Sequence, residues 1–227
     1  MRRILSAAAV CLAALVGCTE PVSKDDGSRI LMMGDSLLAS HSLSGRSVAG
    51  VLEQTLGTPV TDRSVMGARM IYRLPISGAA GLNIPKQFRD GNWEHVVING
   101  GGNDLWLWCG CHACDRKLDK LAARDGSAKG EIPSLIGRLR STGAKVVWVG
   151  YLRSPGVGSP IESCKDEGDE LERRIAAFAE RTEGVTFVSL ADMVPHGDRS
   201  YHGFDMIHPS VKGSREIARR VAAALRK

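Results

Sequence analysis

The sequence predicts a single α/β domain of the doubly wound type, with helices on both faces of a five-stranded parallel sheet. Short apolar runs alternate with longer segments of helical periodicity along the 227 residues. The apolar runs are rich in Val, Ile and Leu and nearly unbroken, which is typical of strands buried on both faces of a parallel sheet. No Gly/Pro-rich linker or internal repeat interrupts this alternation. One domain over residues 28–227 is therefore expected.

Five strands and four helices are expected, in alternating order. The expected strands cover residues 29–33, 59–65, 95–99, 145–150 and 186–190. The expected helices cover residues 48–56, 132–139, 167–181 and 211–225. Gly57 provides a stop for the first helix, and Leu171, Ile175 and Phe178 form one apolar stripe on the third. Because ligands in such sheets bind beyond the carboxyl ends of the strands, functional residues are sought there.

The first residues have the pattern of a bacterial export signal. Positive charges on Arg2 and Arg3 precede an apolar stretch over residues 4–16, which is too short to span a bilayer as a helix. The stretch leads into Gly17 and Cys18, a sequence that resembles the lipobox, in which the cysteine receives lipid and becomes the first residue. We predict a signal peptide over 1–17, lipidation of Cys18 and a flexible polar tether over 18–27. An ordinary secretory peptide with an incidental cysteine is the alternative.

Composition is that of an ordinary soluble domain, with 43% hydrophobic and 24% charged residues. The formal net charge is +5, but Arg2 and Arg3 lie in the segment expected to be removed. No run of basic residues and no basic stripe with interspersed aromatic residues is present, so nucleic acid is not an expected partner. We expect a monomer.

Four cysteines remain in the exported domain: Cys109, Cys111, Cys114 and Cys164. In an oxidising compartment an even number of cysteines favours disulfides, here two with three possible pairings. A bond between Cys109 and Cys111 would close a very tight ring, so Cys164 is expected to join one member of the cluster while the other two pair. Alternatives are a metal site that also uses His112, and a thioredoxin-like redox motif at 111–114.

Ser36 and His208 are the candidate nucleophile and general base. Ser36 follows an apolar strand in a Gly-Asp-Ser turn, which would place its hydroxyl at the edge of the sheet. A serine hydroxyl needs a base, and Asp205, three residues before His208, can bind the Nδ1–H of that histidine. Nε2 would then be free to accept the serine proton. His196 and His202 lie in a nearby loop and are weaker candidates, because no acidic residue precedes them at a suitable spacing.

Two further glycine-containing segments offer hydrogen-bond donors for an oxyanion. Asn103 contributes a side-chain amide after three consecutive glycines, which let the backbone pass close to a substrate. Gly67, after the second strand, contributes a backbone N–H. Acyl-transfer sites require hydrogen-bond donors that point at the oxygen on which negative charge develops.

Together these motifs resemble those of the SGNH (GDSL) hydrolase family. Its four sequence blocks are matched, in the family's order, by Gly34-Asp35-Ser36, Gly67, Gly101-Gly102-Asn103-Asp104 and Asp205-Met206-Ile207-His208. The resemblance implies a flavodoxin-like three-layer α/β/α fold with Ser36 as nucleophile, His208 as base and Asp205 as its orienting acid. The implied oxyanion hole consists of the Ser36 and Gly67 amides and the Asn103 side chain. Leu38 departs from the family, which often has a small polar residue there, and we expect it to shape the pocket.

The resemblance implies hydrolysis of carboxylic esters through an acyl-serine intermediate, without a metal or organic cofactor. Trp106 and Trp108 are expected in the acyl or sugar pocket, and Arg153 is expected to meet an anionic substrate group. Lipid or lysophospholipid esters and O-acetyl groups on envelope glycans both suit an exported, lipid-anchored enzyme. Thr19 after Cys18 favours the periplasmic face of the outer membrane. An acyltransferase or a catalytically silent binding protein of the same fold remains an alternative, as does a metal or redox module at the cysteine cluster.

Overall fold

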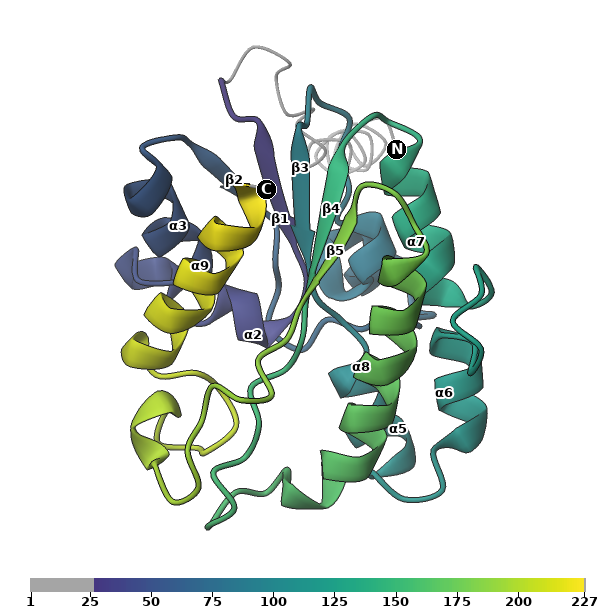
Figure 1. The fold of residues 1–227 in the computed structure, drawn as a ribbon, viewed down its shortest axis with the longest axis vertical. Helices are drawn as coiled ribbons and strands as arrows, with labels where there is room; N and C mark the ends of the chain where they lie inside the picture. The colour runs from purple at the N-terminus through teal and green to yellow at the C-terminus, as the bar shows by residue number, and fades with distance from the viewer. Residues whose placement is uncertain (1–26, 227) are drawn as a thin grey trace, which may run out of the picture.

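The computed structural model describes residues 27–226 and contains one five-stranded sheet between two layers of helices (Figure 1). All neighbouring strands are parallel, and their order is β2-β1-β3-β4-β5. The strands are β1 (Ile30–Met33), β2 (Val60–Asp62), β3 (His95–Ile98), β4 (Lys145–Val149) and β5 (Val185–Val188). This is the flavodoxin-like order, so the expected three-layer α/β/α fold is confirmed. The expected signal peptide, Cys18 and the tether up to residue 26 lie outside the described residues.

Helices cover both faces of the sheet. The longer ones are α3 (Val48–Leu56), α5 (Gly102–Cys109), α6 (Asp115–Leu121), α7 (Glu131–Arg140), α8 (Lys165–Glu180) and α9 (Val211–Leu225). The short ones are α2 (Ser36–Ala39), α4 (Pro75–Ser77), η1 (Ser42–Ser44), η2 (Gly78–Leu82), η3 (Ile84–Lys86), η4 (Glu162–Cys164) and η5 (Arg199–Tyr201). In Figure 1, α2, α3 and α9 lie on one side of the sheet and α5 to α8 on the other.

Alternation along the strands divides the apolar residues into two cores. On β1, Ile30 and Met32 pack with α3 and α9, whereas Leu31 and Met33 pack with α7 and α8. Every residue of β1 is buried, as expected for a strand between two helical layers. The core therefore anchors β1 from both faces, and it fixes where the chain leaves the sheet at Gly34.

Local sequence determines where the two best-predicted helices begin and end. The Ser47 hydroxyl accepts a hydrogen bond from the Gly50 N–H and caps α3, which ends at Gly57 with φ +63°. The Ser210 hydroxyl caps α9 in the same way, accepting from the Gly213 N–H. Both helices have the bounds expected from the sequence.

Two parts of the chain differ from the expectation. The predicted strand over 59–65 is shortened to β2, because the Asp62 carboxylate accepts hydrogen bonds from the N–H and hydroxyl of Ser64 and turns the chain. Helices α5 and α6 were not predicted. They are short, and the glycines before α5 and the cysteines between the two obscure their periodicity. Within residues 27–226, no helix combines the length and apolar character needed to cross a bilayer.

Candidate active site

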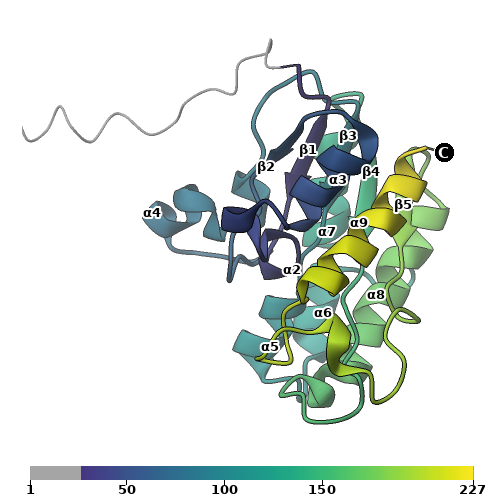
Figure 2. The same ribbon diagram turned by 90° about the vertical axis from the view of Figure 1, so that its left-hand side faces the viewer.

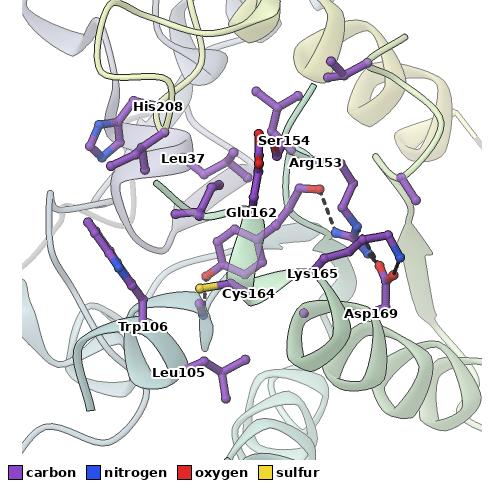
Figure 3. Close-up of a pocket in the computed structure, with 18 of the residues that line it drawn as sticks. Leu37, Leu105, Trp106, Arg153, Ser154, Glu162, Cys164, Lys165, Asp169 and His208 are labelled. Atoms are coloured by element: carbon purple, nitrogen blue, oxygen red, sulfur yellow. Dashed lines mark hydrogen bonds and ion pairs between the residues drawn. The ribbon is translucent and has the colours of Figure 1, made fainter. Parts of the chain in front are cut away.

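A cavity of about 760 Å³ lies beyond the carboxyl ends of the strands. Its walls come from the segments that follow β1, β3, β4 and β5 and from the start of α8. Figure 3 shows Trp106 and His208 on one side of this cavity and Arg153, Lys165 and Asp169 on the other. The position agrees with the rule that open α/β sheets bind ligands where the strand order reverses, here between β1 and β3.

Ser36 lines the cavity as the first residue of α2. The chain reaches it through Gly34, whose φ of +148° is accessible mainly to glycine, and a Cβ there would collide with the Asn99 side chain. Asp35 caps α2, since its carboxylate accepts a hydrogen bond from the Leu37 N–H at 3.0 Å. The backbone N–H of Ser36 has no acceptor within residues 27–226 and is available to a ligand.

The Asp35 carboxylate joins the ends of three strands. One oxygen accepts a hydrogen bond from the Asn99 side-chain amide at 2.7 Å, and the other accepts the Tyr151 hydroxyl proton. The same Tyr151 oxygen accepts the N–H of Gly102 at 2.9 Å. Burial raises the pKa of Asp35, and these hydrogen bonds oppose that rise. The network therefore fixes the segments after β1, β3 and β4 relative to one another.

His208 and Asp205 form the predicted pair. The Nδ1–H of His208 donates to Asp205 Oδ2 at 2.6 Å, and Asp205 Oδ1 accepts the N–H groups of Ile207 and His208. Burial acts to raise the pKa of Asp205, but the hydrogen bonds from His208 and Ile207 lower it below its usual value. An ionised Asp205 holds the tautomer of His208 that leaves Nε2 free to accept a proton.

Ser36 and His208 line the same cavity, as the sequence predicted for a nucleophile and its base. The Nε2–H of His41 donates to the Pro209 carbonyl at 2.9 Å and so connects the segment after α2 to the residue after His208. Within the described chain, no hydrogen bond joins the Ser36 hydroxyl directly to His208. Such contacts are often long without substrate and shorten when it binds.

The two remaining oxyanion candidates lie in adjacent segments. Asn103 lines the cavity, and one N–H of its amide donates to the Ala68 carbonyl at 3.0 Å, which leaves the second N–H available. Gly67 lies in the exposed turn just before Ala68, with φ +76°. Gly67 therefore precedes the residue whose carbonyl binds the Asn103 amide, but Gly67 itself does not line the cavity.

Asp104, to which the sequence analysis gave no role beyond its place in the third motif, connects the segments that carry these two candidates. Its two carboxylate oxygens accept the N–H groups of Met70 and Ile71 at 2.8 and 2.9 Å. Burial raises the pKa of Asp104 to about 6. The carboxylate thus fastens the segment that follows Gly67 to the start of α5.

The predicted substrate-pocket residues divide into two groups. Trp106 and Arg153 line the cavity, but the Arg153 guanidinium is already paired with Glu172 at 2.6 Å and with Asp169. The predictions for Leu38 and Trp108 are wrong. Leu38 is fully buried in the core formed with α3 and α9, because it lies on the inner face of α2. Trp108 lies near the far end of α5, away from Asn103, and lines a different cavity.

The two alternative histidines, His196 and His202, differ in whether they reach the cavity. His196 lines the cavity, whereas His202 is only 5% exposed and neither ring nitrogen has a hydrogen-bond partner among the described residues. Burial lowers the pKa of His202. Neither histidine has a carboxylate on its ring nitrogen of the kind that His208 has.

All four cysteines of the domain form disulfides, Cys109 with Cys114 and Cys111 with Cys164. The expectation that Cys164 joins one member of the cluster is confirmed. Because each sulfur is used in a disulfide, the cluster offers no thiolate to a metal, and the 111–114 pair cannot act as one redox couple. The metal and redox interpretations are therefore not supported in this oxidised form.

Sequence reasoning missed several residues that hold the site together: His41, Gln87, Asn99 and Tyr151. Gln87 is completely enclosed and bonds both the N–H and the carbonyl of Gly34. Asn99, directly after β3, could have been found as a polar residue at a strand end. Tyr151 likewise follows the fourth expected strand, although its partner Asp35 is 116 residues away. His41 has no such signal, and its partner is 168 residues away.

Comparisons with known proteins agree with this geometry. The sequence matches the GDSL-like lipase/acylhydrolase family over residues 32–216. No curated protein matches it at the sequence level.

Solved structures with the same fold include three bacterial or fungal proteins. A candidate acylhydrolase from Bacteroides fragilis has a TM-score of 0.61 at 19% identity, with 89% of this chain and 88% of that one covered. A candidate SGNH hydrolase from Slackia heliotrinireducens has a TM-score of 0.56 at 22% identity, with coverages of 88% and 100%. A carbohydrate esterase family 2 enzyme from Corynascus thermopiles, which carries a carbohydrate-binding domain, has a TM-score of 0.58 at 14% identity, with coverages of 91% and 67%. With the family match over residues 32–216, and with Ser36, Asn103 and His208 at one cavity, the chain belongs to the GDSL-like lipase/acylhydrolase family.

Proposed function

We propose that the protein hydrolyses carboxylic esters through an acyl-serine intermediate. The observation that carries this proposal is that Ser36 and His208, from distant parts of the chain, line one cavity, and that Asp205 holds the His208 ring. The Ser36 hydroxyl attacks the ester carbonyl while Nε2 of His208 takes its proton. His208 then gives this proton to the departing alcohol, and it activates a water that releases the acid and restores Ser36.

The N–H of Ser36 and the free N–H of Asn103 are the donors that would stabilise the oxyanion. Gly67 would add a third after a small movement of its exposed turn. Removal of one such donor typically lowers the rate about a hundred- to a thousand-fold. Asp205 keeps His208 in the required tautomer and stabilises the imidazolium that forms during each proton transfer.

Lipid-type esters are the substrates that the cavity suits best. Side chains such as Leu105, Trp106, Ile161 and Leu171 make its lining mainly apolar, and its volume of about 760 Å³ greatly exceeds the space for an acetyl group. The Arg153 charge is neutralised by Glu172 and Asp169, so the wall beside it does not select an anionic substrate. These features favour an acyl chain over the O-acetyl group of a glycan.

Export and lipid anchoring at Cys18 remain part of the proposal. The two disulfides support an oxidising compartment, since such bonds are rare in reducing cytosol. The periplasmic face of a bacterial membrane would bring the domain close to lipid esters.

Replacing the nucleophile tests the reaction. Ser36→Ala should lower kcat on p-nitrophenyl butyrate at least about 1,000-fold, because no other group can form the acyl intermediate. Ser42→Ala, in the exposed turn that follows α2, is the matched control and should keep full activity. Full activity in Ser36→Ala with an unchanged melting temperature would rule out the proposed reaction.

Varying the acyl chain tests the substrate class. Each methylene buried contributes about 0.8 kcal/mol, or about fourfold in binding of the transition state. Extending p-nitrophenyl acetate to the hexanoate should therefore raise kcat/KM up to about 200-fold. Ile161→Asp should remove most of this gain while changing acetate hydrolysis little. A kcat/KM that is highest for acetate would favour the O-acetyl substrates instead.

A further inference from the structure

A second, basic cavity lies outside the candidate active site. Its volume is about 310 Å³, and its lining includes Arg73, Arg116, Lys117 and Lys120 around the ring of Trp108. It shares no lining residue with the cavity that holds Ser36. Nothing in the ester hydrolysis proposed above uses these residues.

Lys117 is the most informative member of the basic group. Lys117 is only 8% exposed, and its ammonium lies 3.9 Å from the centre of the Trp108 ring. Burial lowers the pKa of Lys117, and the neighbouring cations Lys120, Arg73 and Arg69 lower it further, while Asp104 opposes them. An ammonium held among other cations is stabilised by an anion, so this arrangement favours a negatively charged ligand.

The cations of the cavity lack acidic partners. No ion pair within residues 27–226 involves Arg73, Arg116, Lys117 or Lys120. Asp104, whose charge opposes the fall in the pKa of Lys117, accepts hydrogen bonds from the backbone N–H groups of Met70 and Ile71. Asp115, which lies on α6 with Arg116, Lys117 and Lys120, pairs with Arg124.

Exposed apolar side chains follow or flank two of the lining residues in sequence. Trp108, which lines the cavity, is 57% exposed and its neighbour Leu107 is 55% exposed. Leu74 and Ile76, which follow the lining residue Arg73, are 64% and 86% exposed. Figure 2 shows α4 projecting from the body of the domain on the side that also carries α5. Large apolar residues beside unpaired cations are the combination found on surfaces that enter the lipid–water interface.

We infer that this surface, formed by Arg73, Arg116, Lys117, Lys120, Leu74, Ile76, Leu107 and Trp108, docks onto an anionic phospholipid bilayer. The cavity takes the phosphate of a headgroup, and the exposed apolar side chains insert among the acyl chains. A soluble polyanion would be matched by the charges alone and would leave the four apolar side chains in water. The inference does not depend on the ester hydrolysis, because the two cavities are separate.

Vesicle binding tests the docking surface. The experiment uses residues 18–227 with Cys18→Ser. This protein contains every residue of the two apolar cores and carries no lipid. This protein should sediment with vesicles of equal parts phosphatidylglycerol and phosphatidylcholine, and not with phosphatidylcholine alone. Arg116→Glu with Lys120→Glu should weaken the partition coefficient at least about 30-fold, since each basic residue near an anionic surface adds about fivefold.

The matched control carries Arg138→Glu with Lys145→Glu. It has the same change of charge, but its sites are exposed at the opposite end of the sheet, where α7 ends and β4 begins. Its binding should stay within about threefold of the unchanged protein. Far-UV circular dichroism and melting temperature establish that each variant is folded, independently of esterase activity.

Tryptophan emission separates a bilayer from other polyanions. Anionic vesicles should shift the emission to shorter wavelength, and Trp108→Ala should remove the shift. Absence of vesicle binding, equal loss in both charge-reversed pairs, or binding to dextran sulfate as tight as to vesicles without an emission shift would each overturn the inference.

Discussion

Gly34, Asp35 and Ser36 form a turn in which each residue has a separate structural task. Gly34 supplies a conformation and a close approach that a side chain would prevent. Asp35 caps α2 and accepts hydrogen bonds from Asn99 and Tyr151, so three hydrogen bonds fix the residue that precedes Ser36. Ser36 lines the cavity with a hydroxyl that has no partner among the described residues, whereas the Asp35 carboxylate, which also lines it, is held by hydrogen bonds. The turn is therefore built so that one hydroxyl is exposed while its neighbours are fixed.

The elevated pKa of Asp104 predicts a specific dependence of stability on pH. The folded protein holds this proton up to about pH 6, whereas the unfolded chain releases it near 3.8. Since the folded state binds the proton more tightly, the contribution of Asp104 is fully present below pH 3.8 and is lost as pH rises to about 6. The loss is on the order of 3 kcal/mol.

Asp104→Asn should remove this dependence. Urea unfolding at pH 4 and pH 7 gives the free energy of unfolding for both proteins. The difference between them, unchanged protein minus variant, should fall by a few kcal/mol between the two pH values. A difference that is constant or that rises with pH would contradict the assignment of a buried, proton-binding Asp104.

Sequence reasoning reached the proposed catalytic residues because each is marked locally. Asp205 lies three residues before His208, and Ser36 directly follows a strand. It did not identify Tyr151, although this residue follows an expected strand, and it could not identify His41, whose partner is 168 residues away. It also could not foresee that Leu38 turns into the core. Rotation of α2 about its axis decides the position of Leu38, and a helix of four residues gives too little periodicity to fix that rotation.

At the level of elements, the two disulfides fasten the walls of the cavity. The Cys111–Cys164 bond links the loop after α5 to the start of α8, and Cys164 itself lines the cavity. The Cys109–Cys114 bond closes only the local turn between α5 and α6. The long-range bond is therefore the one expected to keep opposite walls in position.

Removing each bond separately should give unequal losses of stability. Loop-closure entropy over a sequence separation of 53 residues corresponds to about 4 kcal/mol, and over a separation of 5 residues to about 2 kcal/mol. Cys111→Ser with Cys164→Ser should thus cost more in urea unfolding than Cys109→Ser with Cys114→Ser, and only the former should raise KM for long-chain esters. Equal losses with unchanged KM would show that the long bond does not shape the cavity.

The two helices that begin with a serine cap, α3 and α9, have the bounds expected from the sequence. α7 and α8 have no side-chain cap, and their bounds differ from the expected ones by one or two residues. α5 and α6 were not predicted. α5 starts after consecutive glycines, which disfavour helices in isolation, and its burial against α6 and α8 compensates. Tertiary contacts of this kind cannot be read from local sequence.

For the whole molecule, parallel topology brings distant residues together. The strand order places the ends of β1 and β3 side by side, so Ser36 and Asn103 line one cavity although 67 positions separate them. The carboxyl-end rule predicted this shared location from the motifs alone. The size and apolar character of the cavity, and the separate basic cavity beside Trp108, depend on how α5, α6 and α8 pack, and these could not be predicted.

Covalent labelling tests the account most directly. A fluorophosphonate ester reacts only with a serine whose hydroxyl is activated by a base. Peptide mass spectrometry should find one adduct per molecule, on Ser36. In His208→Ala, which keeps the serine but lacks the base, labelling should slow at least about 100-fold. An adduct on another residue, or an unchanged rate in His208→Ala, would contradict a site in which His208 activates Ser36.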